Sequence, residues 1–169
     1  MAIHVLAMNF AAPLLTLALL RIRSGTSALL GPRGLALATS LQLILLWSWH
    51  APAGLSAALG NHALHAVMQL SLFAAALWFW LAVAAQKGGG RWLAIGALLL
   101  TGKLFCLLGV LLVFTSRILY PAIPASDLAD QQLAGLLMIA ACPATYVLAG
   151  VVIAWRWLAE LGPAEARAG

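Results

Sequence analysis

The sequence predicts an all-α membrane protein, a single domain built as a bundle of five transmembrane helices. Of its 169 residues, 64% are hydrophobic and only 8% are charged, which leaves too little polar surface to coat a soluble globule. Crossing the hydrocarbon layer takes about 20 mainly apolar residues. Five runs approach or exceed that length, at residues 5–20, 35–49, 62–85, 92–115 and 131–155. None shows the alternation of barrel strands, so each is predicted to be a helix.

Charges and turn residues separate the five helices in order. The first run ends at Arg21, and the second, which is the shortest, is stopped by Pro52 because proline cannot continue a helix. The third and fourth runs are joined by a glycine turn at residues 88–90. The fifth follows Asp130, whose carboxylate could cap it. Residues 51–61 are expected to form a short connecting loop.

The basic residues predict the orientation. Seven of the nine Lys and Arg residues fall on one side of the five helices: Arg21, Arg23, Arg33, Lys87, Arg91, Arg156 and Arg167. Because Lys and Arg remain cytoplasmic, we expect an exported (periplasmic) N-terminus and a cytoplasmic C-terminus in a bacterial inner membrane. The basic pI of about 10.0 then reflects topology and contact with anionic lipid. It does not indicate nucleic-acid binding, since no basic stripe is interleaved with aromatic residues.

Four histidines fall at the exported boundary: His4, His50, His62 and His65. His62 and His65 are three residues apart, so on a helix they point within about 60° of each other. Because the second and third helices should be antiparallel neighbours, His50 can approach either of them. Taken together, His50, His62 and His65 favour a metal-ligand role over a structural one.

Methionines extend this pattern into the membrane. Met8 shares a face with His4, Met68 lies one turn inside His65, and Met138 lies about 12 Å into the fifth helix. Imidazole and thioether ligands together suit copper, especially the reduced ion. For His4 and each methionine taken singly, a structural role is favoured, because methionine commonly fills gaps between helices.

Two further polar residues have competing interpretations. Asp130 either caps the fifth helix or orients a ligating histidine, and the two roles are compatible. Lys103 lies near mid-depth in the fourth helix with no carboxylate at its depth. An intramembrane lysine is a functional candidate by default. Three alternatives are favoured over a transport role: a neutral amine, bonding to backbone carbonyls or Thr101, and contact with a partner protein.

Three stretches carry a family resemblance. They are WSWHAP at residues 47–52, NHALHAVM at 61–68, and LYPAIP at 119–124 followed by LADQQLAGLLM at 128–138. In order and spacing they resemble the CtaG-type cytochrome c oxidase assembly family of bacterial membrane proteins, over nearly the whole chain. The resemblance implies help in maturing a haem-copper oxidase, with copper supplied to its catalytic subunit. A periplasmic copper donor is a further expected partner. The residues it implies are His50, His62, His65 and Asp130, with His4 and Met138 weaker.

The sequence thus predicts a copper-binding assembly factor without turnover chemistry. It contains no nucleophile–base pair, phosphate loop or paired catalytic carboxylates. Two alternatives remain open. A metal-free structural subunit of the oxidase would use its Gly- and Ala-rich helix faces for packing. A haem-binding electron carrier would need a histidine pair deep enough to clasp a porphyrin.

Overall fold

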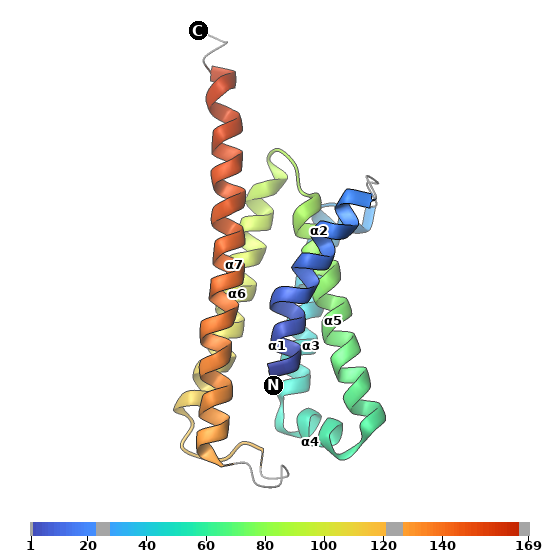
Figure 1. Cartoon of the computed structure of the whole chain (residues 1–169), viewed down its shortest axis with the longest axis vertical. Coiled ribbons are helices and arrows are strands. Elements are labelled where there is room, and N and C mark those ends of the chain that lie inside the picture. The colour runs from blue at the N-terminus through green and yellow to red at the C-terminus, as the bar shows by residue number, and fades with distance from the viewer. Residues whose placement is uncertain (1, 23–27, 121–126, 166–169) are drawn as a thin grey trace.

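The computed structural model describes residues 2–22, 28–120 and 127–165, and these are almost entirely helical with no β-strand. The elements are α1 (Ala2–Leu6), the π-helical turn η1 (Ala7–Ala11), α2 (Ala12–Ile22), the 3₁₀ turn η2 (Ala28–Leu30), α3 (Pro32–His50), α4 (Pro52–Gly60), α5 (His62–Ala85), α6 (Gly90–Phe114) and α7 (Leu128–Glu165). The long helices run side by side along one axis, and α7 extends beyond the others (Figure 1).

Four helices among the described residues are long and apolar enough to cross a membrane: Ile3–Arg21, His62–Ala85, Gly90–Phe114 and Leu128–Leu161. A fifth span is added if α3 and α4, which meet at a bend of 73°, are counted as one. The predicted class, an all-α polytopic membrane protein, is therefore confirmed.

The segment at residues 51–61 differs from the prediction. It was expected to be a loop, but most of it forms the helix α4. As predicted, α3 ends at His50, where Ala51 takes an extended conformation with ψ of 141°. Pro52 then occupies the first turn of α4, where its fixed φ and missing N–H are well tolerated. The proline that ends one helix therefore also begins the next.

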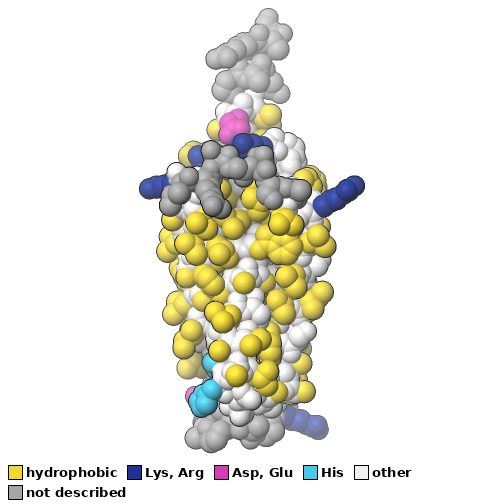
Figure 2. Space-filling view, turned by 90° about the vertical axis from the view of Figure 1, so that its right-hand side faces the viewer, with side chains coloured by type: hydrophobic (Ala, Val, Ile, Leu, Met, Phe, Trp, Pro, Cys, Tyr) yellow, Lys and Arg dark blue, Asp and Glu magenta, His cyan; other side chains and the backbone are white. Residues whose placement is uncertain are grey.

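The surface is divided by residue type along the long axis (Figure 2). Apolar side chains cover the middle, most of the visible Lys and Arg lie toward one end, and histidine lies at the other end. The apolar band matches a surface that contacts lipid hydrocarbon. The end that carries His4, His50 and His62 also contains α4 and the start of α7 (Figure 1).

Helices α6 and α7 pack closely because two glycines face each other. A Cβ atom on Gly135 would lie 2.6 Å from the carbonyl oxygen of Gly109, and one on Gly109 would lie 2.9 Å from that of Gly135. Small residues at helix contacts in membranes permit this close backbone approach. At the cytoplasmic end predicted from the charges, the Arg91 guanidinium donates two hydrogen bonds to the Glu160 carboxylate, at 2.6 and 3.0 Å.

Glutamines at the start of α7 complete the α6–α7 pair. The Gln131 amide donates to the carbonyls of Leu112 at 3.2 Å and Arg117 at 3.3 Å, and its oxygen accepts from the Leu119 N–H at 2.8 Å. Gln132 donates to the Val113 carbonyl at 3.3 Å. The last carbonyls of a helix have no partner within it, so these side chains satisfy groups that lipid could not.

Candidate metal centre

Two histidines from distant parts of the chain meet inside the bundle. His4 comes from α1 and His50 is the last residue of α3, and their Nε2 atoms lie 3.3 Å apart. The rings are close to perpendicular, at 76°, with centroids 5.1 Å apart. Only 3% of His4 and 4% of His50 is exposed. The pair is thus a polar contact shielded by the surrounding helices.

The His50 ring is held in a defined orientation. Its Nδ1–H donates to the Leu46 carbonyl one turn earlier, at 2.7 Å, which leaves Nε2 with the lone pair of a neutral imidazole. The Tyr120 hydroxyl donates to the His50 carbonyl at 2.8 Å, and burial raises the pKa of Tyr120 so that it keeps its proton. A histidine that donates its other ring N–H to a carbonyl is the usual arrangement of a metal ligand.

His4 is less completely bonded. Its Nδ1 atom is buried and has no hydrogen-bond partner within the part of the chain that the structure describes. If His4 Nε2–H donates to His50, Nδ1 is left as an unused acceptor; if the proton is on Nδ1, two lone pairs face each other across 3.3 Å. The first arrangement leaves a buried polar group unsatisfied. The second leaves the buried Nδ1–H unpaired as well, and it adds two facing lone pairs that a cation can occupy.

The other two histidines lie at the start of α5. Asn61 caps this helix, with its side-chain oxygen accepting from the N–H groups of Ala63 at 2.8 Å and Leu64 at 3.2 Å. His62 is exposed and His65 half-buried. The Nε2 of His65 is 3.4 Å from the Gln69 amide nitrogen. Among the described residues His50 contacts His4, whereas no hydrogen bond joins His62 or His65 to that pair.

The acidic candidate lies on the surface. Asp130 is exposed in the first turn of α7, and its N–H donates to the Asp127 carboxylate at 2.8 Å. The cap of α7 is therefore Asp127, and the prediction that Asp130 supplies it was wrong. The reason is one of register, because the helix begins at Leu128 rather than at 131. Asp130 keeps its favourable place near the positive end of the helix dipole.

The methionines are buried in the core. Met8 and Met138 are 1% exposed and Met68 is 2% exposed. Across residues 2–22, 28–120 and 127–165, no three His, Cys, Asp or Glu side chains come close enough together to hold a metal ion. A metal at the His4–His50 pair would therefore have two imidazoles as its His, Cys, Asp or Glu ligands within the described residues.

Two supporting groups were not identified from the sequence. One is the Leu46 carbonyl, which sits four residues before His50, the spacing at which a helical side chain can reach back to the preceding turn. The other is Tyr120, which belongs to the LYPAIP stretch but had no assigned role. The position of a histidine at a helix end followed by proline could have indicated the bond to the Leu46 carbonyl. No local sequence pattern indicates the role of Tyr120.

These features define a polytopic helical membrane protein with a buried histidine pair at one end of its bundle. Over residues 1–160 the chain matches the family of cytochrome c oxidase caa3 assembly factors (Caa3_CtaG), and it belongs to that family. Comparison with curated proteins and with solved structures gives no significant match.

Proposed function

We propose that this assembly factor binds Cu(I) on the exported side of the membrane and passes it to the catalytic subunit of the oxidase. The observation that carries the proposal is the buried His4–His50 pair, with its Nε2 atoms 3.3 Å apart and one ring fixed by a backbone carbonyl. A bacterial inner membrane, with the N-terminus periplasmic and the C-terminus cytoplasmic, is the setting that the basic residues support.

The chemistry of the pair favours copper over harder ions. Magnesium and calcium prefer several oxygen ligands, whereas imidazole and thioether ligands suit copper. Cu(I) also accepts low coordination numbers, so two facing imidazoles suffice to hold it. A metal–nitrogen bond is about 2 Å long, so the rings would need to separate only slightly from their present spacing to admit the ion.

Burial supports a route into the pair. His62 is exposed, His65 is half-buried, and His4 and His50 are almost fully buried. An ion handed over by a periplasmic donor would meet the exposed His62 first and then the half-buried His65 before it reaches the pair. Met8, Met68 and Met138, all buried, supply thioethers deeper in the bundle. This role is binding and transfer, and we expect no turnover chemistry.

The test uses cells in which the wild-type protein is replaced by its His50→Ala variant. The copper content and the activity of the purified oxidase should both fall, because one of two imidazoles is lost. Added copper should restore part of both by mass action. His62→Ala, which removes only the exposed first contact on the proposed route, should have a smaller effect. Asp130→Asn should also be mild, because Asn retains hydrogen-bonding capacity but lacks charge.

A metal-free accessory role is the second candidate. It is favoured by the same 3.3 Å contact, since His4 Nε2–H could donate to His50 Nε2 and tie α1 to α3 without an ion. In that case His50→Ala would reduce the amount of folded protein, and the oxidase that does form would contain normal copper. Unchanged copper per oxidase in the variant would therefore exclude the delivery mechanism.

A further inference from the structure

Lys103 lies at the centre of α6 and points away from the bundle. It is thirteen residues from the start of the helix at Gly90 and eleven from its end at Phe114, so it is about 20 Å from one end. Its side chain is exposed, and among the described residues it makes no hydrogen bond or ion pair. On the same helix Leu100 and Leu107 are also exposed, as expected for a surface that contacts lipid.

A lysine in this position is costly in a bare bilayer. The middle of the membrane is about 15 Å from the head groups, too far for a lysine side chain to carry its ammonium to water. Charged residues within spans are almost always paired or face a polar cavity. Lys103 therefore needs a polar partner that neither the described residues of the chain nor the lipid hydrocarbon supplies.

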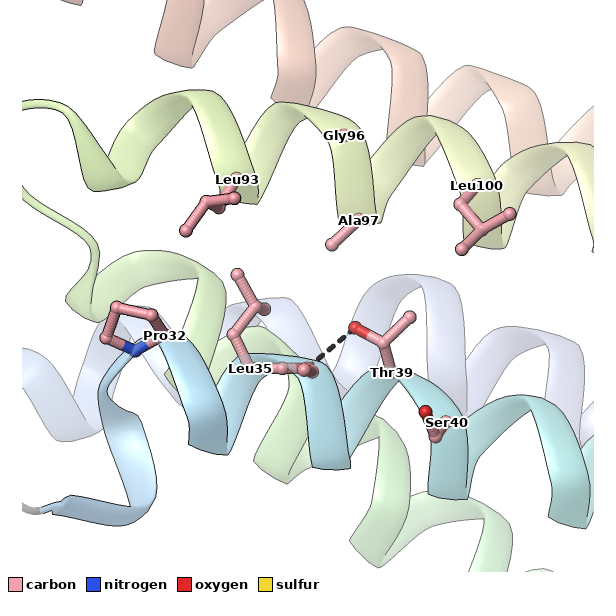
Figure 3. Close-up of a pocket in the computed structure, with 9 residues that line it drawn as sticks. Pro32, Leu35, Thr39, Ser40, Leu93, Gly96, Ala97 and Leu100 are labelled. Carbon is pink, nitrogen blue, oxygen red and sulfur yellow. Dashed lines mark hydrogen bonds between the residues drawn. The ribbon is translucent and has the colours of Figure 1, made fainter.

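A groove between α3 and α6 ends at Leu100, about one turn before Lys103. It encloses about 270 Å³ and is lined on α3 by residues that include Ala36 and Ser40, and on α6 by Gly96, Ala97 and Leu100. Figure 3 shows Leu93, Ala97 and Leu100 facing Leu35 and Thr39 across it, with the Thr39 hydroxyl bonded to the Leu35 carbonyl at 2.7 Å. Lys103 is seven residues from Gly96, two turns further along the same face of α6.

We propose that the α3–α6 groove and Lys103 form a docking surface for a transmembrane helix of another membrane protein, one that carries an Asp or Glu at mid-depth. Small residues let the two backbones approach closely, as helix contacts in membranes require. The carboxylate of the partner then pairs with the ammonium of Lys103. This inference does not depend on copper binding.

A second copy of this chain does not fit the surface. The acidic residues of the chain are Asp127, Asp130, Glu160 and Glu165. All lie near the two ends of α7, where Asp127 caps the helix and Glu160 pairs with Arg91. No carboxylate lies at the depth of Lys103, and two copies meeting at this face would bring two lysines together.

Site-specific photocross-linking of the full chain in its native membrane tests the proposal. A photoreactive residue at Leu100, in the groove, should form an adduct with a membrane protein whose captured helix carries a central Asp or Glu. The same residue at Leu148, on the exposed face of α7, is the matched control and should not capture that protein. In the Lys103→Leu background the adduct should fall by about tenfold, the size expected for loss of an interhelical polar contact.

Further variants separate docking from folding and from copper binding. Lys103→Arg should restore the adduct, and Lys87→Leu, which removes an exposed lysine outside the spans, should leave it unchanged. Purified Lys103→Leu protein should fold and bind copper as the wild type does. An adduct that persists in Lys103→Leu, that contains only lipid or a second copy of the chain, or that joins a helix without an acidic residue would overturn the proposal.

Discussion

Two polar clusters at the same end of the bundle are bonded in different ways. At the start of α7, Gln131 is 7% exposed and takes part in three hydrogen bonds with the backbone around the end of α6. At the histidine pair, His4 is 3% exposed, yet its Nδ1 atom has no partner in the described chain. The Gln131 side chain thus satisfies backbone groups of the helices around it, whereas the histidine pair retains a nitrogen atom with no hydrogen-bond partner in the described chain.

The difference indicates which buried polar residues serve the fold. A fully satisfied buried group stabilises its surroundings, and removing it leaves other groups unpaired. An unsatisfied buried group costs stability, so its retention calls for another explanation. By this criterion Gln131 is structural, and the His4–His50 pair is the better candidate for function.

The largest effect on stability is expected at the contact between α6 and α7. Gly135→Ala would place a methyl group 2.6 Å from the Gly109 carbonyl oxygen and 2.8 Å from a Val113 methyl, which should cost about 2–3 kcal/mol through overpacking. Gly150→Ala is the matched control, because a Cβ there meets nothing within 4 Å. Thermal unfolding of both variants in detergent measures the difference, and equal midpoints would contradict the packing described.

The next effect is expected at Gln131. Gln131→Ala should destabilise the protein by about 1–3 kcal/mol, because it leaves the buried carbonyl of Leu112 and the N–H of Leu119 without this partner. Gln132→Ala, which removes one longer hydrogen bond, should cost less. Copper binding by the purified variants should stay at the wild-type level, and its loss in Gln131→Ala would break the division between the two clusters.

A smaller effect is expected at Tyr120. Tyr120→Phe removes the hydroxyl that donates to the His50 carbonyl and should cost about 1 kcal/mol. Because this hydroxyl holds the end of α3, copper affinity should also weaken, although less than on loss of an imidazole. Chemical unfolding and copper titration of the same preparation check both effects. An affinity change as large as that of His50→Ala would mean that Tyr120 acts more directly than its contact suggests.

The smallest effect on stability is expected at the histidines themselves. The double variant His4→Leu, His50→Leu replaces two buried polar rings with apolar side chains, removing both members of the pair together with the unsatisfied nitrogen. Such replacements are close to neutral or stabilising. The unfolding midpoint should therefore be unchanged or higher. A strong loss of stability would instead support the metal-free structural role.

The fold was largely predictable because each span is a long apolar run bounded by Pro, Gly or charge. The errors concern the residues at which helices begin and end. The helix α4 was missed because its composition, PAGLSAALG at residues 52–60, has no marked amphipathic pattern, and Pro52 was interpreted only as a stop. The start of α7 was placed three residues late, so the cap was assigned to Asp130 instead of Asp127.

The sequence predicted the depth of the candidate site in the membrane, but not which histidine rings contact each other. The sequence placed four histidines at one boundary, and the three helices that carry them do converge there. Which rings meet depends on how each helix is rotated about its axis, and α3 turns His50 toward His4. The rotation follows from packing over the whole length of α3 and α5, which no local pattern encodes. The structure therefore supports His4 as a candidate ligand more strongly than the sequence did. The ligand roles of His62, His65, Asp130 and Met138 stay predictions.

The most direct test is a Cu(I) competition titration of the purified protein against a coloured chelator. Wild-type protein should hold Cu(I), and the double variant His4→Leu, His50→Leu should bind it about 100-fold more weakly or worse. Loss of groups that only support metal ligands already costs up to about 100-fold in affinity, and here the ligands themselves are removed. His62→Ala, on the exposed end of α5, should stay within about tenfold of the wild type. If the double variant binds Cu(I) as tightly as the wild type, the buried histidine pair is not the copper site.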